Sequence, residues 1–179
     1  MLFKITFICD EVEDFLREIT IDADASFLDL NKAILDACGY SDDQITVFYI
    51  CDDKWETKEQ ITREDMETGK SDQDIYIMEK AVLRDFIHDE GQKLIYVFDS
   101  FYDRVLYAKV TEVITGKNCE KPVCSRSKGK APEQIALEDE NLTKLAQTDD
   151  DLMDNDDFYG SDEYDQDDID TDGFEIEER

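Results

Sequence analysis

The chain has 179 residues, of which 48 are acidic and 19 are basic, giving a formal net charge of −29. A charge of that sign and size repels other polyanions, which argues against a dedicated nucleic-acid-binding protein. No run approaches the roughly 20 apolar residues that span a bilayer, so no membrane segment is expected. Five cysteines without the regular spacing of a secreted disulfide framework favour reduced thiols and a cytoplasmic location.

The charge divides the chain into two parts. Residues 133–179 hold 20 acidic residues with Lys144 and Arg179 as their only cations, a net charge of −18. There, apolar residues are too sparse for burial to offset a backbone ordering cost of roughly 1 to 2 kcal/mol per residue. Residues 1–132 are rich in Phe, Tyr, Ile, Leu and Val, enough for one hydrophobic core. We therefore predict one globular domain, 1–132, followed by a mostly disordered acidic tail, 133–179.

The first elements predicted along the chain are a β-hairpin and a helix. Residues 2–9 and 15–22 read as strands, and the short acidic segment between them predicts a turn. Ser26 can cap a helix, because an acidic residue follows three residues later and apolar residues recur at helical spacing until Gly39. Residues 45–51, ITVFYIC, are β-branched and aromatic, which predicts a third strand.

The second half of the domain begins with a polar, irregular stretch. Residues 52–78 predict little beyond a short helix at 62–66 and an apolar IYIM segment at 75–78. AVLRDFI predicts one or two helical turns, and two strands follow at 93–99 and 104–114, joined by a tight SFYD connection. This order predicts an α+β fold: a mixed sheet related to the ubiquitin-like β-grasp, with one main helix packed on it.

Several segments resemble a known family. FLDLNKAILDACGYSDDQITVFYI, then VLRDFI before KLIYVFD, and finally CSRSKGKAPEQ are similar to the plasmid pRi ORF-three-like family, found on plasmids and as passengers in insertion sequences. The family follows a Tyr-x-Tyr-Asp strand with a Gly-Asp-x-Trp-x-His segment. Here Tyr96 and Asp99 match, and Phe98 replaces the second tyrosine. SFYDRVLYAK supplies none of the glycine, tryptophan or histidine, so no chemistry of those residues carries over.

A second family motif is also incomplete in this chain. The family's cysteine followed by Pro-Pro-Glu appears as Cys124, then Pro132 and Glu133, without the paired glycines that come next. The resemblance implies a β-grasp-like α+β domain whose biochemical role is poorly defined and is sometimes labelled by association with transposition.

Candidate catalytic residues are few. His88, the only histidine, stands in FIHDEG at the expected end of a short helix, where a solvated side chain is the simpler interpretation. Asp99 and Asp103 flank the last predicted hairpin, and turn aspartates commonly bond the local backbone. No phosphate-binding glycine loop or nucleophile elbow occurs. We predict that the protein is not an enzyme and has no cofactor.

Two patterns resemble metal-binding motifs, but each lacks ligands that a complete site requires. Cys119 and Cys124 form a C-x4-C pair at the limit of zinc-ligand spacing, but the other three cysteines supply no second pair. DIDTDG, beginning at Asp168, opens like a calcium-binding loop, yet its twelfth position is Arg179 instead of a bidentate glutamate. The sequence therefore predicts no metal site.

Aromatic residues mark two candidate partner-binding regions. In the acidic tail, Phe158, Tyr159, Tyr164 and Phe174 punctuate the charge run, as in segments that bind basic partners, while solubility is the simpler role of such a tail. Trp55, in CDDKWETKEQ just after the third predicted strand, is a candidate exposed anchor. The other interpretation is that it packs over the sheet.

One segment is basic. Residues 117–130 carry a net charge of +4, from one glutamate and five cations: Lys117, Lys121, Arg126, Lys128 and Lys130. We interpret it as a solvated linker folded against the domain's acidic surface or the tail. The leading functional hypothesis is a non-enzymatic protein-interaction module with an unidentified protein partner. The alternative is a nucleic-acid accessory protein, linked to mobile elements by analogy, that contacts DNA phosphates through 117–130.

Overall fold

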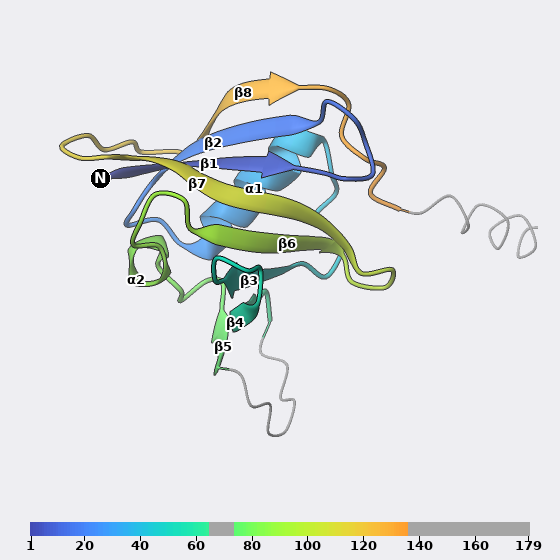
Figure 1. Cartoon of the computed structure of the whole chain (residues 1–179), viewed down its shortest axis with the longest axis horizontal. Helices are drawn as coiled ribbons and strands as arrows, with labels where there is room; N and C mark the ends of the chain where they lie inside the picture. The colour runs from blue at the N-terminus through green and yellow to red at the C-terminus, as the bar shows by residue number, and fades with distance from the viewer. Residues whose placement is uncertain (65–73, 136–179) are drawn as a thin grey trace, which may run out of the picture. The chain divides into compact units, whose positions relative to one another are not determined.

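One mixed sheet of eight strands dominates residues 1–64 and 74–135, which are the parts of the chain that the computed structural model describes (Figure 1). In chain order the elements are β1 (Leu2–Ile8), β2 (Leu16–Asp22), α1 (Phe27–Cys38), β3 (Val47–Cys51), β4 (Thr57–Thr62), β5 (Asp74–Ile77), α2 (Leu83–Phe86), β6 (Lys93–Asp99), β7 (Arg104–Ile114) and β8 (Val123–Lys128). The strand order across the sheet is β5-β4-β3-β6-β7-β1-β2-β8. Neighbouring strands are antiparallel except β4 and β5, which are parallel.

A mixed sheet with few helices confirms the predicted α+β class. The five predicted strands and the main helix are all present, with ends within two residues of the predicted ones. The relation to the β-grasp stays a prediction. The described residues belong to one compact unit, Met1–Ala136. The boundary at residue 132 and the disorder of 133–179 also stay predictions, because most of that tail lies outside the described residues.

Helix α1 begins and ends where its sequence signals predict. The Asp29 amide donates to Ser26 Oγ at 3.1 Å, and the Ser26 amide donates to Asp29 Oδ2 at 3.0 Å, which completes a capping box. Gly39 ends the helix with φ of 72°, a left-handed conformation that glycine adopts without steric cost. The apolar stripe of α1 therefore lies in a fixed position against the sheet.

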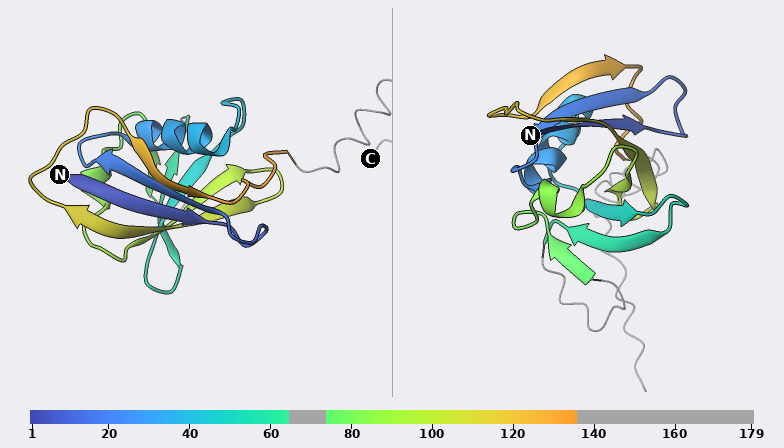
Figure 2. Two further views of the ribbon diagram at one scale, coloured as in Figure 1. Left: turned by 90° about the horizontal axis from the view of Figure 1, so that it is seen from above. Right: turned by 60° about the vertical axis from the view of Figure 1, so that its left-hand side comes forward.

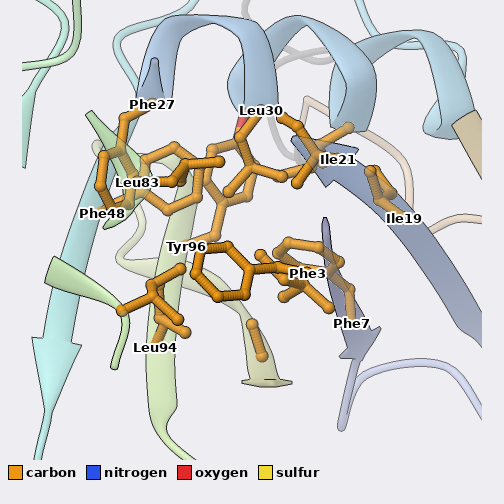
Figure 3. Close-up of a cluster of buried hydrophobic side chains, with 14 of the residues drawn as sticks. Phe3, Phe7, Ile19, Ile21, Phe27, Leu30, Phe48, Leu83, Leu94 and Tyr96 are labelled. Atoms are coloured by element: carbon orange, nitrogen blue, oxygen red, sulfur yellow. The ribbon is translucent and has the colours of Figure 1, made fainter. Parts of the chain in front are cut away.

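The hydrophobic core lies between α1 and one face of the sheet, a layering that the left view of Figure 2 shows from above. Phe27 and Leu30 point from α1 toward the strands in Figure 3. The ring of Phe27 meets that of Phe48 edge-on at 5.3 Å, and the ring centroids of Phe48 and Tyr96 are 4.7 Å apart. The Tyr96 hydroxyl donates to Asn31 Oδ1 at 2.8 Å, so this buried hydroxyl has a hydrogen-bond partner within the core.

Three strands were not predicted. β4 lies in the stretch interpreted as irregular, and Thr62, expected to start a helix, instead ends this strand. β5 covers most of the apolar IYIM segment, and β8 lies in the basic segment interpreted as a linker. Within β4 only Ile61 is an apolar core residue, and all six side chains of β8 are exposed. Both strands form by pairing with a neighbour, which a local pattern does not reveal.

Candidate functional site

The sheet has an open face, defined as the face directed away from α1. Because side chains alternate along a strand, residues between the core positions of β3, β6 and β7 point to this face. They form the open-face groove, a depression of about 410 Å³. Its described lining residues are Ile45, Val47, Tyr49, Thr57, Ile95, Val97, Ser100, Asp103 and Val105.

The strand registers give the groove its direction. Tyr49 of β3 lies opposite Ile95 of β6, and Val47 lies opposite Val97. Val97 in turn lies opposite Val105 of β7. The groove floor is thus an apolar strip across three strands, aliphatic except for Tyr49. Ile45 lies at the rim of the groove, and its side chain is 54% exposed.

Trp55 lies beside the groove and is both packed on the sheet and partly exposed, the two alternatives that the sequence allowed. Its ring packs edge-on against Tyr107 at 5.2 Å, and Lys93 Nζ lies 4.9 Å from the ring centroid. The side chain nevertheless stays 37% exposed. Since Tyr107 lies opposite Ile95 in the β6–β7 pair, this aromatic pair flanks the end of the groove farther from the β6–β7 turn.

Tyr49 and Asp103 are the ionisable residues among the described lining of the groove. Burial raises the pKa of the Tyr49 hydroxyl, and the charge of Asp103 raises it further. Ser100 donates its hydroxyl to the Ile45 carbonyl at 2.9 Å. Tyr49 is therefore uncharged at neutral pH, and the mostly apolar lining around it suits apolar side chains of a ligand.

The predicted turn role of Asp99 is confirmed by its hydrogen bonds. Asp99 Oδ1 accepts the amides of Phe101 and Tyr102 at 3.1 and 3.3 Å. Arg104 Nη1 lies 3.6 Å from Asp99 Oδ2, and its guanidinium also bonds Glu11. Asp99 is thus engaged in holding the β6–β7 turn. His88 is exposed after α2, and its amide donates to the Gln92 side chain.

The cysteines are free thiols in the described part of the chain. Burial raises the pKa of Cys38 to about 12 and that of Cys51 to about 11, so both are neutral and weakly nucleophilic at pH 7. Within residues 1–64 and 74–135, no three His, Cys, Asp or Glu side chains are grouped so that they could hold a metal ion. The expected lack of a metal, a cofactor and an enzymatic role stays a prediction.

The basic segment is not a linker, because part of it forms the edge strand β8. Its cations are exposed: Lys117 and Lys121 precede β8, Arg126 and Lys128 lie within it, and Lys130 follows. Lys128 Nζ bonds Asp14 Oδ1 at 2.5 Å, and Lys130 Nζ lies 3.3 Å from Glu133 Oε1. The other three cations form no ion pair with another described residue.

The structure does not bring all the predicted site residues together. Trp55 flanks the groove on β3, β6 and β7, whereas the five cations lie at the β8 edge of the sheet. The tail aromatics Phe158, Tyr159, Tyr164 and Phe174 lie outside the described residues. The groove itself was missed. Its signal was present in ITVFYIC and KLIYVFD, which are apolar at successive positions and so place apolar side chains on both faces.

These features define an α+β protein with one mixed sheet, one helix-covered face and one open face that is mostly apolar over β3, β6 and β7. The chain belongs to the Plasmid pRiA4b ORF-3-like protein family, whose model matches residues 3–173, as the sequence resemblance predicted. A solved structure of a protein of unknown function from Methanosarcina mazei Go1, MM3350, is similar with a TM-score of 0.59 and 19% identity. That match covers 88% of this chain and 90% of the other and shows the shared fold.

No curated protein matches the chain. In the described residues, neither helix is long and apolar enough to cross a membrane.

Proposed function

We propose that this chain is a non-enzymatic, cytoplasmic protein-interaction module that binds a partner protein through the open-face groove. The observation that supports this proposal is the apolar strip on the face that α1 leaves uncovered. In this strip Val47 and Val97 are buried, Tyr49, Ile95 and Val105 are half-buried, and Ile45 at the rim is exposed. A partly exposed apolar depression of this kind often marks a binding site. In this proposal the acidic tail acts as a solubilising or additional partner-binding segment through Phe158, Tyr159, Tyr164 and Phe174.

Trp55 and Tyr107 supply the anchors of the proposed interface. Tryptophan and tyrosine are enriched among residues that contribute most to protein binding, because each buries a large rigid surface at small entropic cost. Here the two rings already pack together beside the groove. A partner would extend this cluster instead of ordering it. The single main helix on one face also supports the proposed relation to the β-grasp.

The test compares two lysines introduced at equally exposed isoleucines. Ile45, on the groove rim, is 54% exposed, and Ile135, which does not line the groove, is 53% exposed. Full-length wild type, Ile45→Lys and Ile135→Lys are immobilised, and the proteins that each retains from a cell lysate are quantified. We expect at least one protein whose retention falls with Ile45→Lys alone. Retention that is identical for all three chains would refute binding through the groove.

The alternative is a nucleic-acid accessory role through residues 117–130. Three exposed cations without an ion pair among the described residues support it, and the net charge of −29 opposes it. A DNA duplex titrated with the full chain separates the two cases. Binding at about 50 mM salt that weakens steeply as salt rises would support DNA contact, while no binding at that salt would exclude it.

A further inference from the structure

Strand β8 is a terminal strand of the sheet and is exposed along its whole length. It pairs with β2 on one side, and no other described strand pairs with its outer side (Figure 1). An edge strand presents backbone N–H and C=O groups that another extended chain can pair with. All six side chains of β8 are exposed as well.

The C-terminal end of β8 is hydrogen-bonded to a buried arginine. Arg17 is 6% exposed, and its guanidinium donates to the carbonyls of Lys128 at 2.8 Å and Gly129 at 3.1 Å. The same group donates to the Ala37 carbonyl at the end of α1 at 2.9 Å. A buried arginine thus ties the edge strand to the helix. An added strand would meet a template that is already ordered, which reduces the entropic cost of binding.

The charges of β8 favour an acidic partner over a basic one. The register places Arg126 opposite Glu18 and Lys128 opposite Leu16, and these two cations share the open face of the sheet. Lys121 lies just before the strand. Edge lysines and arginines disfavour pairing with a second copy of the same edge, because like charges would be opposed. An acidic strand meets no such repulsion from β8.

We propose that β8 accepts an extended acidic segment of a partner protein as an added strand of the sheet. Such a segment would use both the unpaired backbone groups and the cations, whereas a nucleic acid would use the cations alone. The added strand would pair antiparallel or parallel along Val123–Lys128, with carboxylates next to Lys121 and Arg126. This site is separate from the open-face groove, so each can fail without the other.

The experiment uses the full chain and a fluorescent peptide of about ten residues that alternates glutamate with valine, the length of a long strand. Binding is followed by fluorescence anisotropy at low and physiological salt. A second peptide has proline at two central valines, which keeps the charge and prevents strand pairing. Hydrogen exchange of the Val123–Lys128 amides reports where the peptide binds.

Two double variants test the cations at equal change of charge. Lys121→Gln with Arg126→Gln removes two cations at β8, and Lys54→Gln with Lys80→Gln removes two exposed cations elsewhere. We expect the β8 variant to bind about two-fold to thirty-fold more weakly, from the contribution of two exposed ion pairs. The matched control and Ile45→Lys should bind as wild type does. Weaker binding of the proline peptide and protection of β8 amides are also expected.

Three results would overturn the proposal. The first is no binding of the glutamate–valine peptide at about 50 mM salt, where attraction between exposed charges is least screened. The second is equal binding of the proline peptide, which would mean that charge alone is recognised. The third is protection of β8 by single-stranded DNA and not by the peptide. None of these results bears on the groove, because the Ile45→Lys retention experiment tests that site separately.

Discussion

The two faces of β3 and β6 are made from alternate residues of the same strands, yet they differ in composition and burial. On the side of α1, Phe48 and Tyr96 are fully buried aromatic residues. On the open face, their chain neighbours Tyr49 and Ile95 are half-buried and line the open-face groove. The two-residue period of a strand therefore separates the residues that hold the fold from those available for recognition.

The difference in burial between the two faces of β3 and β6 follows from the position of α1, because both faces of these strands are mostly apolar and only one is covered by the helix. α1 supplies Phe27 and Leu30 to one face, and in the described residues no helix lies against the other. The open face instead receives Trp55 at one end. Substitutions on the two faces should accordingly differ in their effects on stability and on binding.

The largest expected effect is on the covered face. Phe48→Ala removes a fully buried ring that contacts Phe27 and Tyr96, so we expect a loss of about 3–5 kcal/mol in unfolding free energy. Tyr49→Ala, one residue away on the open face, should cost about 1 kcal/mol. Urea denaturation of both variants measures the difference. Equal losses would show that the open face is part of the core.

The second largest effect is expected just after β8. The side chains of this strand are exposed, but Gly129, which follows it, makes a close backbone contact with Asp14. Gly129 has φ of 70°, and a Cβ there would lie 2.6 Å from the Asp14 carbonyl oxygen. Left-handed strain and overpacking together predict a loss of about 2 to 4 kcal/mol for Gly129→Ala. Gly116→Ala has the same φ sign and open space around the Cβ, so it should cost only about 1 to 2 kcal/mol.

Thermal or urea unfolding, with hydrogen exchange at β8, distinguishes these two glycines. If Gly116→Ala cost as much as Gly129→Ala, the close contact with Asp14 would contribute nothing and the backbone strain would account for both losses.

A smaller effect concerns the cap that positions α1 over the covered face. Ser26→Ala removes one half of the capping box and should cost about 1 kcal/mol. Ser100→Ala, at the open face, loses one hydrogen bond to the Ile45 carbonyl and should cost about 0.5 kcal/mol. The two midpoints in urea can be compared directly. A larger loss at Ser100 would mean that the groove rim depends on this bond more than the helix depends on its cap.

The sequence predicted the elements that carry their own local signals. The capping box at Ser26 and the left-handed Gly39 defined α1, and the β-branched run in ITVFYIC defined β3. Strand β8 carries no such signal, because its conformation depends on Arg17 and on pairing with β2, both of which lie far away in the chain. Tertiary contacts of this kind are not visible in a local pattern.

The groove was hidden for a different reason. A strand that is apolar on both faces predicts two buried faces, and only the topology shows that one helix covers one of them. Trp55 illustrates the same limit: its position after β3 allowed exposure or packing, and the structure shows both. The local sequence around such a residue does not determine how far its side chain is exposed for binding and how far it is packed for stability.

The smallest expected effect tests that balance at Trp55. Its φ of 68° is unusual for a residue other than glycine and costs about 1 to 2 kcal/mol. Trp55→Gly relieves this strain while losing the contacts with Tyr107 and Lys93, which are worth a similar amount. We therefore expect the unfolding free energy of Trp55→Gly to stay within about 0.5 kcal/mol of wild type.

Trp55→Ala is the matched control, because it loses the same contacts and keeps the strain, so it should be about 1 kcal/mol less stable than Trp55→Gly. Urea unfolding of the two variants isolates the backbone contribution. If they were equally stable, the turn would have relaxed and Trp55 would hold no strain. If glycine is the more stable, the chain maintains a strained tryptophan beside the groove, which is where strain retained for binding is expected.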